Sequence, residues 1–217
     1  MEILKLKEML EKLAYYTKQN LNLYLNKDGE SLNYWIKKLI NKQILIPIKK
    51  GLYVSSFYLD KVREKKEMDK YLEYLASIIR YPSYISLEYA LAKYGLIPES
   101  TYAITSITIK TTRTYQSKIT TFLYRNIKDS LFTGFIEEKY NKQVIKIATP
   151  AKALFDYLYF KKFSSPEEIK EYLLETGRIN WSALSDSDKK IAKKYFQRTS
   201  SKKMNNILKI LVNNEIL

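Results

Sequence analysis

Residues 1–58 carry a spacing of apolar side chains that restricts the possible fold more than any other feature of the chain. Apolar residues recur at helical spacing in three successive segments, residues 6–13, 21–25 and 32–39. Two short β-prone runs follow, at residues 44–48 and 52–55. We therefore predict three helices and a hairpin, which is the element order of a winged helix-turn-helix.

Polar residues indicate where these helices begin. We predict Thr17 as the N-cap of the second helix and Ser31 as the N-cap of the third, because a side-chain oxygen there can accept from the free helix N–H groups. Residues 26–29 (Asn-Lys-Asp-Gly) form a turn between the two helices. In the third helix four apolar residues are expected to point inward: Leu32, Trp35, Ile36 and Leu39.

The pattern changes near residue 60, and we predict two domains, residues 1–60 and 61–217. Residues 61–70 are charged and resemble a linker, with a helix as the alternative. Helices are expected at 68–80 and 86–94, the second with Ser86 as N-cap and Gly95 at its end. Four runs rich in Ile, Thr, Tyr and Phe then indicate strands: residues 102–109, 119–125, 131–137 and 143–148.

A last group of helices is expected to follow the strands. Thr149 and Pro150 are suited to the N-cap and first position of a helix. Further helices are expected at residues 166–174, 188–196 and 203–212. The expected fold class is α+β: a winged helix-turn-helix, then an α+β domain with a small, mainly antiparallel sheet flanked by helices.

Charge indicates the kind of partner. The chain has 38 Lys and Arg against 23 Asp and Glu, a formal net charge of +15. Such an excess favours a polyanion, and clustered cations gain entropy by displacing counterions from nucleic-acid phosphates. An anionic membrane is the alternative, but the apolar runs are far shorter than the roughly 18 residues needed to span one. Residues 1–5 also lack the apolar block of a signal peptide. We expect a cytoplasmic protein without a membrane partner.

Missing residue types exclude several chemistries. The chain has no cysteine and no histidine, which excludes disulfides, thiolate zinc sites, Cys nucleophiles and His bases. With only 5 glycines, it has no Gly-rich loop to hold phosphates. We expect no enzyme activity, metal, cofactor or small-molecule substrate.

The outer face of the third predicted helix is the main candidate site. In a helix-turn-helix this helix lies in the major groove. Asn33 and Lys37 are four residues apart, as are Tyr34 and Lys38, so they line one side. Asn suits adenine, and Lys suits guanine or phosphate. The predicted contacts to double-stranded DNA, including the hairpin tip, are Ser31, Asn33, Tyr34, Lys37, Lys38, Lys49 and Lys50. A winged helix that only contacts proteins is the alternative.

Two stretches without acidic residues, 100–128 and 189–214, could add phosphate contacts. A solvated basic face is the usual meaning of such a stretch. Beside a DNA-binding domain, second phosphate contacts are the other interpretation. The candidates are Lys110, Arg113, Lys118, Arg125, Lys189, Lys190, Lys193 and Lys194.

One enzyme-like pattern is a competing hypothesis. Asp129, Glu137 and Lys139 have the order and rough spacing of a metal-dependent nuclease motif. However, residues 137–139 are expected at a hairpin turn, where charged residues are ordinary. We interpret the pattern as a coincidence.

Six stretches, taken in order, resemble the AbiEi family of antitoxins from type IV abortive-infection toxin–antitoxin systems. They are residues 48–54 (IKKGLYV), 82–91 (PSYISLEYAL), 94–99 (YGLIPE), 104–108 (ITSIT), 131–135 (LFTGF) and 147–156 (IATPAKALFD). This chain has Ala151 where the family usually shows Glu. The resemblance implies a repressor that binds inverted repeats in its own promoter. It also implies a C-terminal domain that neutralises a nucleotidyltransferase-type toxin without a stable complex.

Overall fold

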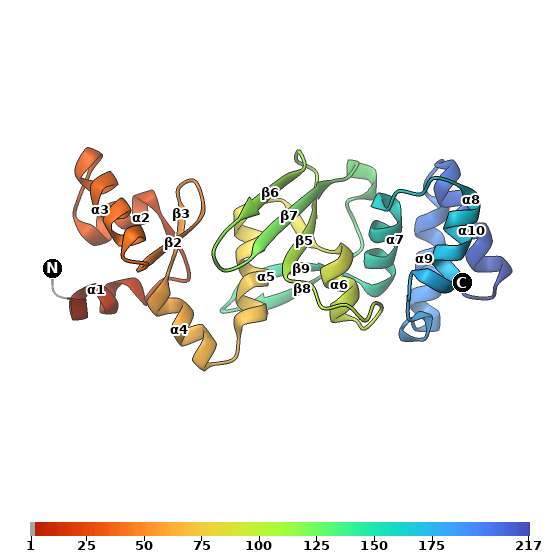
Figure 1. The fold of residues 1–217 in the computed structure, drawn as a ribbon, viewed down its shortest axis with the longest axis horizontal. Helices are drawn as coiled ribbons and strands as arrows, with labels where there is room; N and C mark the ends of the chain where they lie inside the picture. Colours follow the sequence, from red (N-terminus) through yellow and green to blue (C-terminus); the bar gives the residue numbers. More distant parts are fainter. Residues whose placement is uncertain (1–2) are drawn as a thin grey trace.

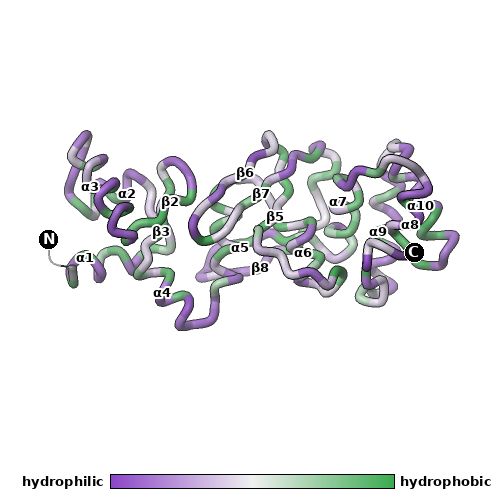
Figure 2. Tube along the Cα trace, in the orientation of Figure 1, coloured by the Kyte–Doolittle hydropathy of each residue, from purple (hydrophilic) through white to green (hydrophobic). Residues whose placement is uncertain are grey.

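The computed structural model describes residues 3–217. Three groups of elements follow one another along an elongated molecule: an N-terminal unit, a six-stranded sheet with its helices, and a C-terminal group of helices (Figure 1). Apolar residues concentrate along the inner strands of the sheet and along helix α7 (Pro150–Phe160), whereas the turn after helix α4 (Ser56–Glu64) is polar (Figure 2). The helices and the two sheets together make the chain a mixed α+β protein.

The N-terminal unit contains three helices and a small antiparallel sheet of order β1-β3-β2. Its elements are α1 (Ile3–Leu10), β1 (Tyr16–Thr17), α2 (Lys18–Leu25), α3 (Gly29–Asn41), β2 (Leu45–Lys49) and β3 (Leu52–Ser55). Thr17 is confirmed as an N-cap: its hydroxyl accepts from the backbone N–H of Asn20, whose side chain accepts from Thr17 in return. The end of α2 is fixed by Asn26, in the left-handed region with φ 50°.

The prediction of Ser31 as the cap of α3 was wrong. The helix begins two residues earlier, at Gly29, and Leu32 N–H already donates to the carbonyl of Asp28 at 2.8 Å. Ser31 therefore lies exposed in the first turn. The inward face is as predicted, with Leu32, Ile36 and Leu39 buried and Trp35 half-buried against them.

The predicted linker is mostly helical. Helices α4 (Ser56–Glu64) and α5 (Met68–Ile79) are separated by three residues, and the predicted boundary at residue 60 falls inside α4. The hairpin and the central sheet share a core, in which Ile48, Leu52 and Val54 pack with α5 and the strands. The N-terminal unit is thus packed against the rest of the chain.

The larger sheet is mixed, with strand order β6-β7-β5-β4-β9-β8. Its strands are β4 (Ser83–Ile85), β5 (Ala103–Thr108), β6 (Arg113–Gln116), β7 (Thr121–Asn126), β8 (Phe135–Tyr140) and β9 (Gln143–Ala148). The pairs β5–β7 and β4–β9 are parallel and the other pairs antiparallel. We had not predicted β4 and β6. Strand β4 has only three residues, all buried, and β6 has only four, mostly exposed. Neither strand therefore shows the alternation of apolar and polar residues that would indicate a strand in the sequence.

The predicted hairpin of the last two strands is confirmed, but its turn lies elsewhere. Glu137, Glu138 and Lys139 belong to β8, and the chain reverses at Asn141 and Lys142. Both turn residues have positive φ, 46° and 65°, as a two-residue hairpin turn requires.

Five further α-helices follow: α6 (Leu87–Lys93), α7 (Pro150–Phe160), α8 (Pro166–Glu171), α9 (Asp186–Gln197) and α10 (Lys202–Asn213). A π-helix (Tyr172–Thr176) continues α8, and two 3-10 helices lie at Asp129–Leu131 and Trp181–Ala183. Thr149 is confirmed as the N-cap of α7, accepting from the N–H of Lys152, with Pro150 first in the helix. Ser86 does precede α6, but its hydroxyl makes no capping bond.

The hydroxyl of Ser86 instead donates to Asp156 on α7, inside a fully buried network. Tyr84 and Ser86 donate to Oδ2 of Asp156 at 2.9 and 2.8 Å, and Lys152 Nζ donates to Oδ1 at 2.5 Å. Burial lowers the pKa of Lys152 and raises that of Asp156, and each charge opposes the shift of the other. The network joins β4 and the start of α6 to α7.

Replacing Asp156 by Leu should lower the free energy of unfolding by about 3–5 kcal/mol, because the Lys152 ammonium would stay buried without its partner. Urea unfolding measures the change. Asp60→Asn is the matched control: it removes an exposed ion pair with Arg63 and should cost less than about 1 kcal/mol. Equal losses in the two variants would contradict a stabilising role of the buried pair.

Candidate nucleic-acid interface

Helix α3 lies at the end of the molecule that is remote from the large sheet (Figure 1). Asn33, Tyr34 and Lys37 are exposed there, opposite the buried apolar face, and Tyr34 is 62 % exposed. An amide, a phenol and an ammonium on one helix face can all donate to base edges or phosphates.

Lys38 is placed differently from Lys37. Its Nζ lies 4.7 Å from the ring centre of Trp35 and 5.8 Å from that of Tyr34, so the ammonium interacts with the aromatic faces. This contact folds the side chain over α3 and leaves it half-buried. Lys38 therefore contributes to the packing of Trp35 as well as to the charge of the surface.

The beginning of α2 adds residues that the sequence analysis missed. Lys18 and Gln19 are exposed in its first turn, just after the Thr17 cap. The N-terminal turn of a helix favours phosphate through its free N–H groups and its dipole. The cap at Thr17 was the available signal, because it places Lys18 at that end.

The structure separates the two lysines of the hairpin tip. Lys49 is half-buried, and its Nζ donates to the carbonyl of Ile79 at the C-terminal end of α5, at 2.6 Å. Lys50 is exposed. The hairpin lies on the side of the N-terminal unit that faces the sheet, which brings Lys49 to α5 (Figure 1).

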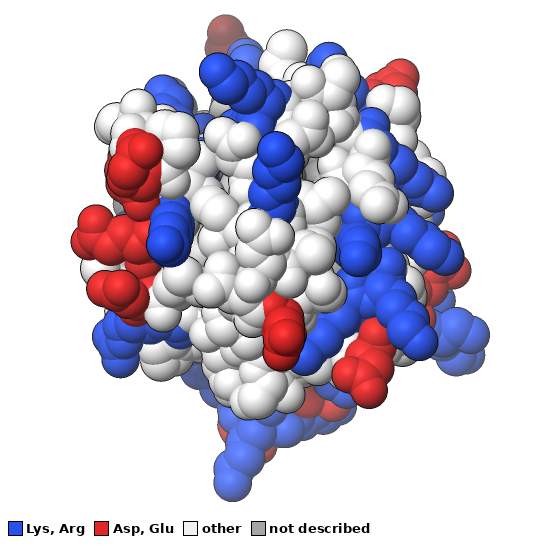
Figure 3. Space-filling model, turned by 90° about the vertical axis from the view of Figure 1, so that its right-hand side faces the viewer, with Lys and Arg blue, Asp and Glu red and all other residues white. Residues whose placement is uncertain are grey.

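The secondary phosphate candidates fall into two groups far apart in the molecule. Those of the first stretch are exposed on β6, β7 and the adjoining loops, at one edge of the large sheet: Lys110, Arg113, Lys118 and Arg125. The candidate lysines of the second stretch lie on α9, at the opposite end from α3: Lys189, Lys190, Lys193 and Lys194. Seen from this end, charges of both signs surround an uncharged centre (Figure 3).

The three residues of the nuclease-like pattern lie on two elements. Asp129 is in a short 3-10 helix (Asp129–Leu131) rather than on a strand, and Glu137 and Lys139 are exposed on β8. Glu137 lies 3.7 Å from the ammonium of Lys146 on the neighbouring strand. Residues 3–217 contain no cluster of three or more acidic side chains placed to hold a metal ion.

Compared with known protein families and with curated proteins, the chain matches no family model and no individual protein. Within the described part of the chain, every helix is too short or too polar to cross a lipid bilayer.

The two hairpin lysines should respond differently to substitution. If this surface binds DNA, as the sequence predicts, Lys50→Ala should make the slope of log affinity against log salt shallower by about 1 unit on random duplex DNA, because one phosphate contact would be lost. Lys49→Ala should keep the slope and lower the free energy of unfolding by about 1 kcal/mol, because the bond to Ile79 is lost. Fluorescence anisotropy and urea unfolding measure these effects. A shallower slope in Lys49→Ala would mean that Lys49 leaves Ile79 when DNA binds.

Proposed function

We propose that this chain is a DNA-binding transcriptional repressor whose N-terminal unit is a winged helix-turn-helix. In this proposal α2 and α3 form the helix-turn-helix, and the β2–β3 hairpin is the wing. The observation that carries it is the exposed face of α3, with Asn33, Tyr34 and Lys37 opposite a buried apolar face. The net charge of +15 supports a polyanionic partner.

The side chains then have distinct roles. Helix α3 enters the major groove, where the Asn33 amide pairs with adenine and Lys37 donates to guanine or phosphate. Lys18 at the start of α2 and Lys50 on the wing contact phosphates and fix the orientation of α3. Base contacts supply discrimination, and phosphate contacts supply affinity that depends on salt.

The resemblance to AbiEi proteins supports a second role, as the cytoplasmic antitoxin of a type IV system. Two of the stretches that carry the resemblance, residues 82–91 and 147–156, meet at the buried carboxylate of Asp156. In this proposal the operator contains inverted repeats in the chain's own promoter. The rest of the chain neutralises a nucleotidyltransferase-type toxin without a stable complex. Ala151, at the position where the family usually shows Glu, is fully buried and has no polar side-chain group, so it takes no polar part in that role.

Substitutions on α3 test the repressor proposal. On an operator selected from random DNA, Asn33→Ala or Lys37→Ala should each lose about 1–3 kcal/mol of binding free energy, and much less on random DNA, because base contacts carry discrimination. Lys139→Ala, an equal change of charge on β8, is the matched control and should bind as the wild type does. Equal weakening on both DNAs would place the recognition surface elsewhere.

A plasmid-nicking assay tests the nuclease hypothesis. Supercoiled plasmid incubated with magnesium or manganese should stay intact in the presence of the wild-type chain. Nicking that Asp129→Asn abolishes would favour the metal-dependent nuclease instead.

A full-length variant can separate repression from neutralisation. The double variant Asn33→Ala/Lys37→Ala should lose operator binding, yet still rescue cells in which an unrelated promoter drives the cognate toxin, because neutralisation does not need repression. Cell survival measures the rescue. A folded double variant that gives no protection, beside a wild type that does, would contradict this division of roles. Failure of the wild type as well would contradict the antitoxin assignment alone.

A further inference from the structure

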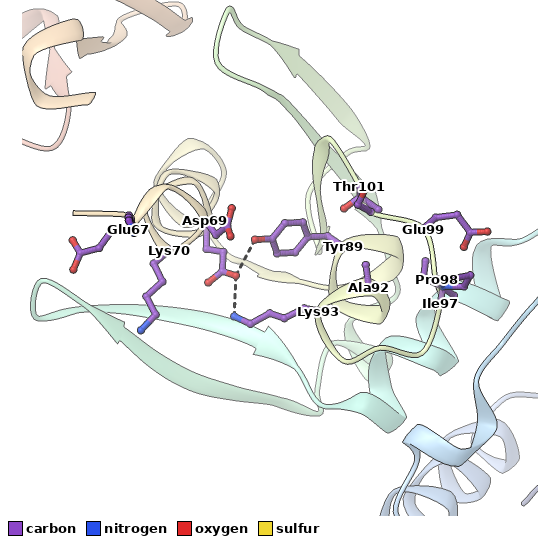
Figure 4. A pocket seen from close by; sticks show the side chains of 13 residues that line it. Glu67, Asp69, Lys70, Tyr89, Ala92, Lys93, Ile97, Pro98, Glu99 and Thr101 are labelled. Atoms are coloured by element: carbon purple, nitrogen blue, oxygen red, sulfur yellow. Dashed lines mark hydrogen bonds and ion pairs between the residues drawn. The ribbon is translucent and has the colours of Figure 1, made fainter. Parts of the chain in front are cut away.

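An open cleft of about 750 Å³ lies between α5, α6 and the loop of residues 97–101. Figure 4 shows Asp69 and Lys70 on the α5 side, and Tyr89 and Lys93 reaching across from α6. The cleft lies apart from α3, so the proposed DNA interface does not use it.

Glu73 lines this cleft and is only 1 % exposed. Its Oε1 accepts from the hydroxyl of Tyr89 at 3.0 Å and from the ammonium of Lys93 at 2.8 Å. Its Oε2 is buried and has no hydrogen-bond partner among the described residues. A buried carboxylate oxygen without a donor is costly, so this position favours an additional N–H or O–H group.

The surroundings favour a positively charged donor. Four carboxylates and three lysines line the cleft, although bases outnumber acids 38 to 23 in the whole chain. Lys93 is shared, because its ammonium also lies 3.6 Å from Glu138 on β8. Burial and the negative charge of nearby carboxylates, Glu73 first among them, raise the pKa of Tyr89. This region is therefore locally negative on a basic protein.

We propose that the cleft between α5 and α6 binds a small organic cation, whose ammonium or guanidinium group donates to Oε2 of Glu73. The remaining carboxylates at the cleft, Glu67, Asp69 and Glu99, attract the cation. The cleft volume lies within the range of small-molecule sites.

Calorimetric titration of the full chain at low salt tests this site, with putrescine as the ammonium probe and agmatine as the guanidinium probe. At least one of them should bind with a stoichiometry of one, whereas the uncharged analogue 1,4-butanediol should not bind. Glu73→Gln should weaken binding by about ten- to a hundredfold, because a hydrogen bond to a charged group is lost. Asp60→Asn removes the same charge outside the cleft and should bind as the wild type does.

A second variant covers the case in which Glu73→Gln does not fold. Ser100 is exposed on the loop at the cleft, so Ser100→Trp should fold and obstruct the cleft, with at least a tenfold loss of affinity. The proposal is overturned if neither amine binds the wild type. It is also overturned if folded Glu73→Gln binds as the wild type does, if Ser100→Trp leaves the affinity unchanged, or if Asp60→Asn loses as much affinity as Glu73→Gln.

Discussion

The buried carboxylate of Asp156 holds helix α7 against strand β4 of the large sheet and against the start of helix α6. A buried ion pair is tolerated only when its polar atoms are satisfied, and Asp156 receives Lys152, Tyr84 and Ser86 together. Tyr84 and Ser86 lie on and just after the three-residue strand β4, which pairs antiparallel with β5 and parallel with β9 and so joins the two halves of the sheet. The same bonds hold the backbone where α6 begins, and Leu87, the next residue, has a φ of 61°, which is strained for leucine.

A second constraint joins the N-terminal unit to the rest of the chain. Apolar residues of the hairpin share a core with α5, the Tyr71 hydroxyl donates to the carbonyl of Ala14, and Lys49 donates to that of Ile79. These contacts connect α5 to two segments of the N-terminal unit. The orientation of α3 relative to the sheet is therefore set by packing rather than by a free linker. A fixed orientation of α3 would suit the proposed repressor, because the two half-sites of an inverted repeat lie a fixed distance apart on DNA.

The sequence predicted correctly those helix ends that depend on hydrogen bonds between residues close together in the chain. Thr17 and Thr149 cap helices because the acceptor and the free N–H lie three residues apart in one segment. Ser86 shows the limit: its hydroxyl is taken by a residue 70 positions away, which no local pattern reveals. Lys49 was predicted at the wing for its charge, whereas its bond to Ile79 depends on the packing of α5. The pair Lys152 and Asp156 did leave a signal, since two opposite charges four residues apart interrupt an otherwise apolar helix.

Helix α5 links these constraints to the proposed functions. Its C-terminal carbonyl holds Lys49 of the hairpin, while Asp69, Lys70 and Glu73 in its first half line the cleft. A ligand in the cleft would thus contact the first half of this twelve-residue helix, while the hairpin of the proposed DNA-binding unit contacts its last turn. Proximity alone does not couple two sites: a ligand changes DNA affinity only by as much as its own affinity differs between the free and the DNA-bound forms. A shift of α5 between the two forms would produce such a difference, and the shared core that holds α5 to the hairpin is the contact through which that shift would reach α3.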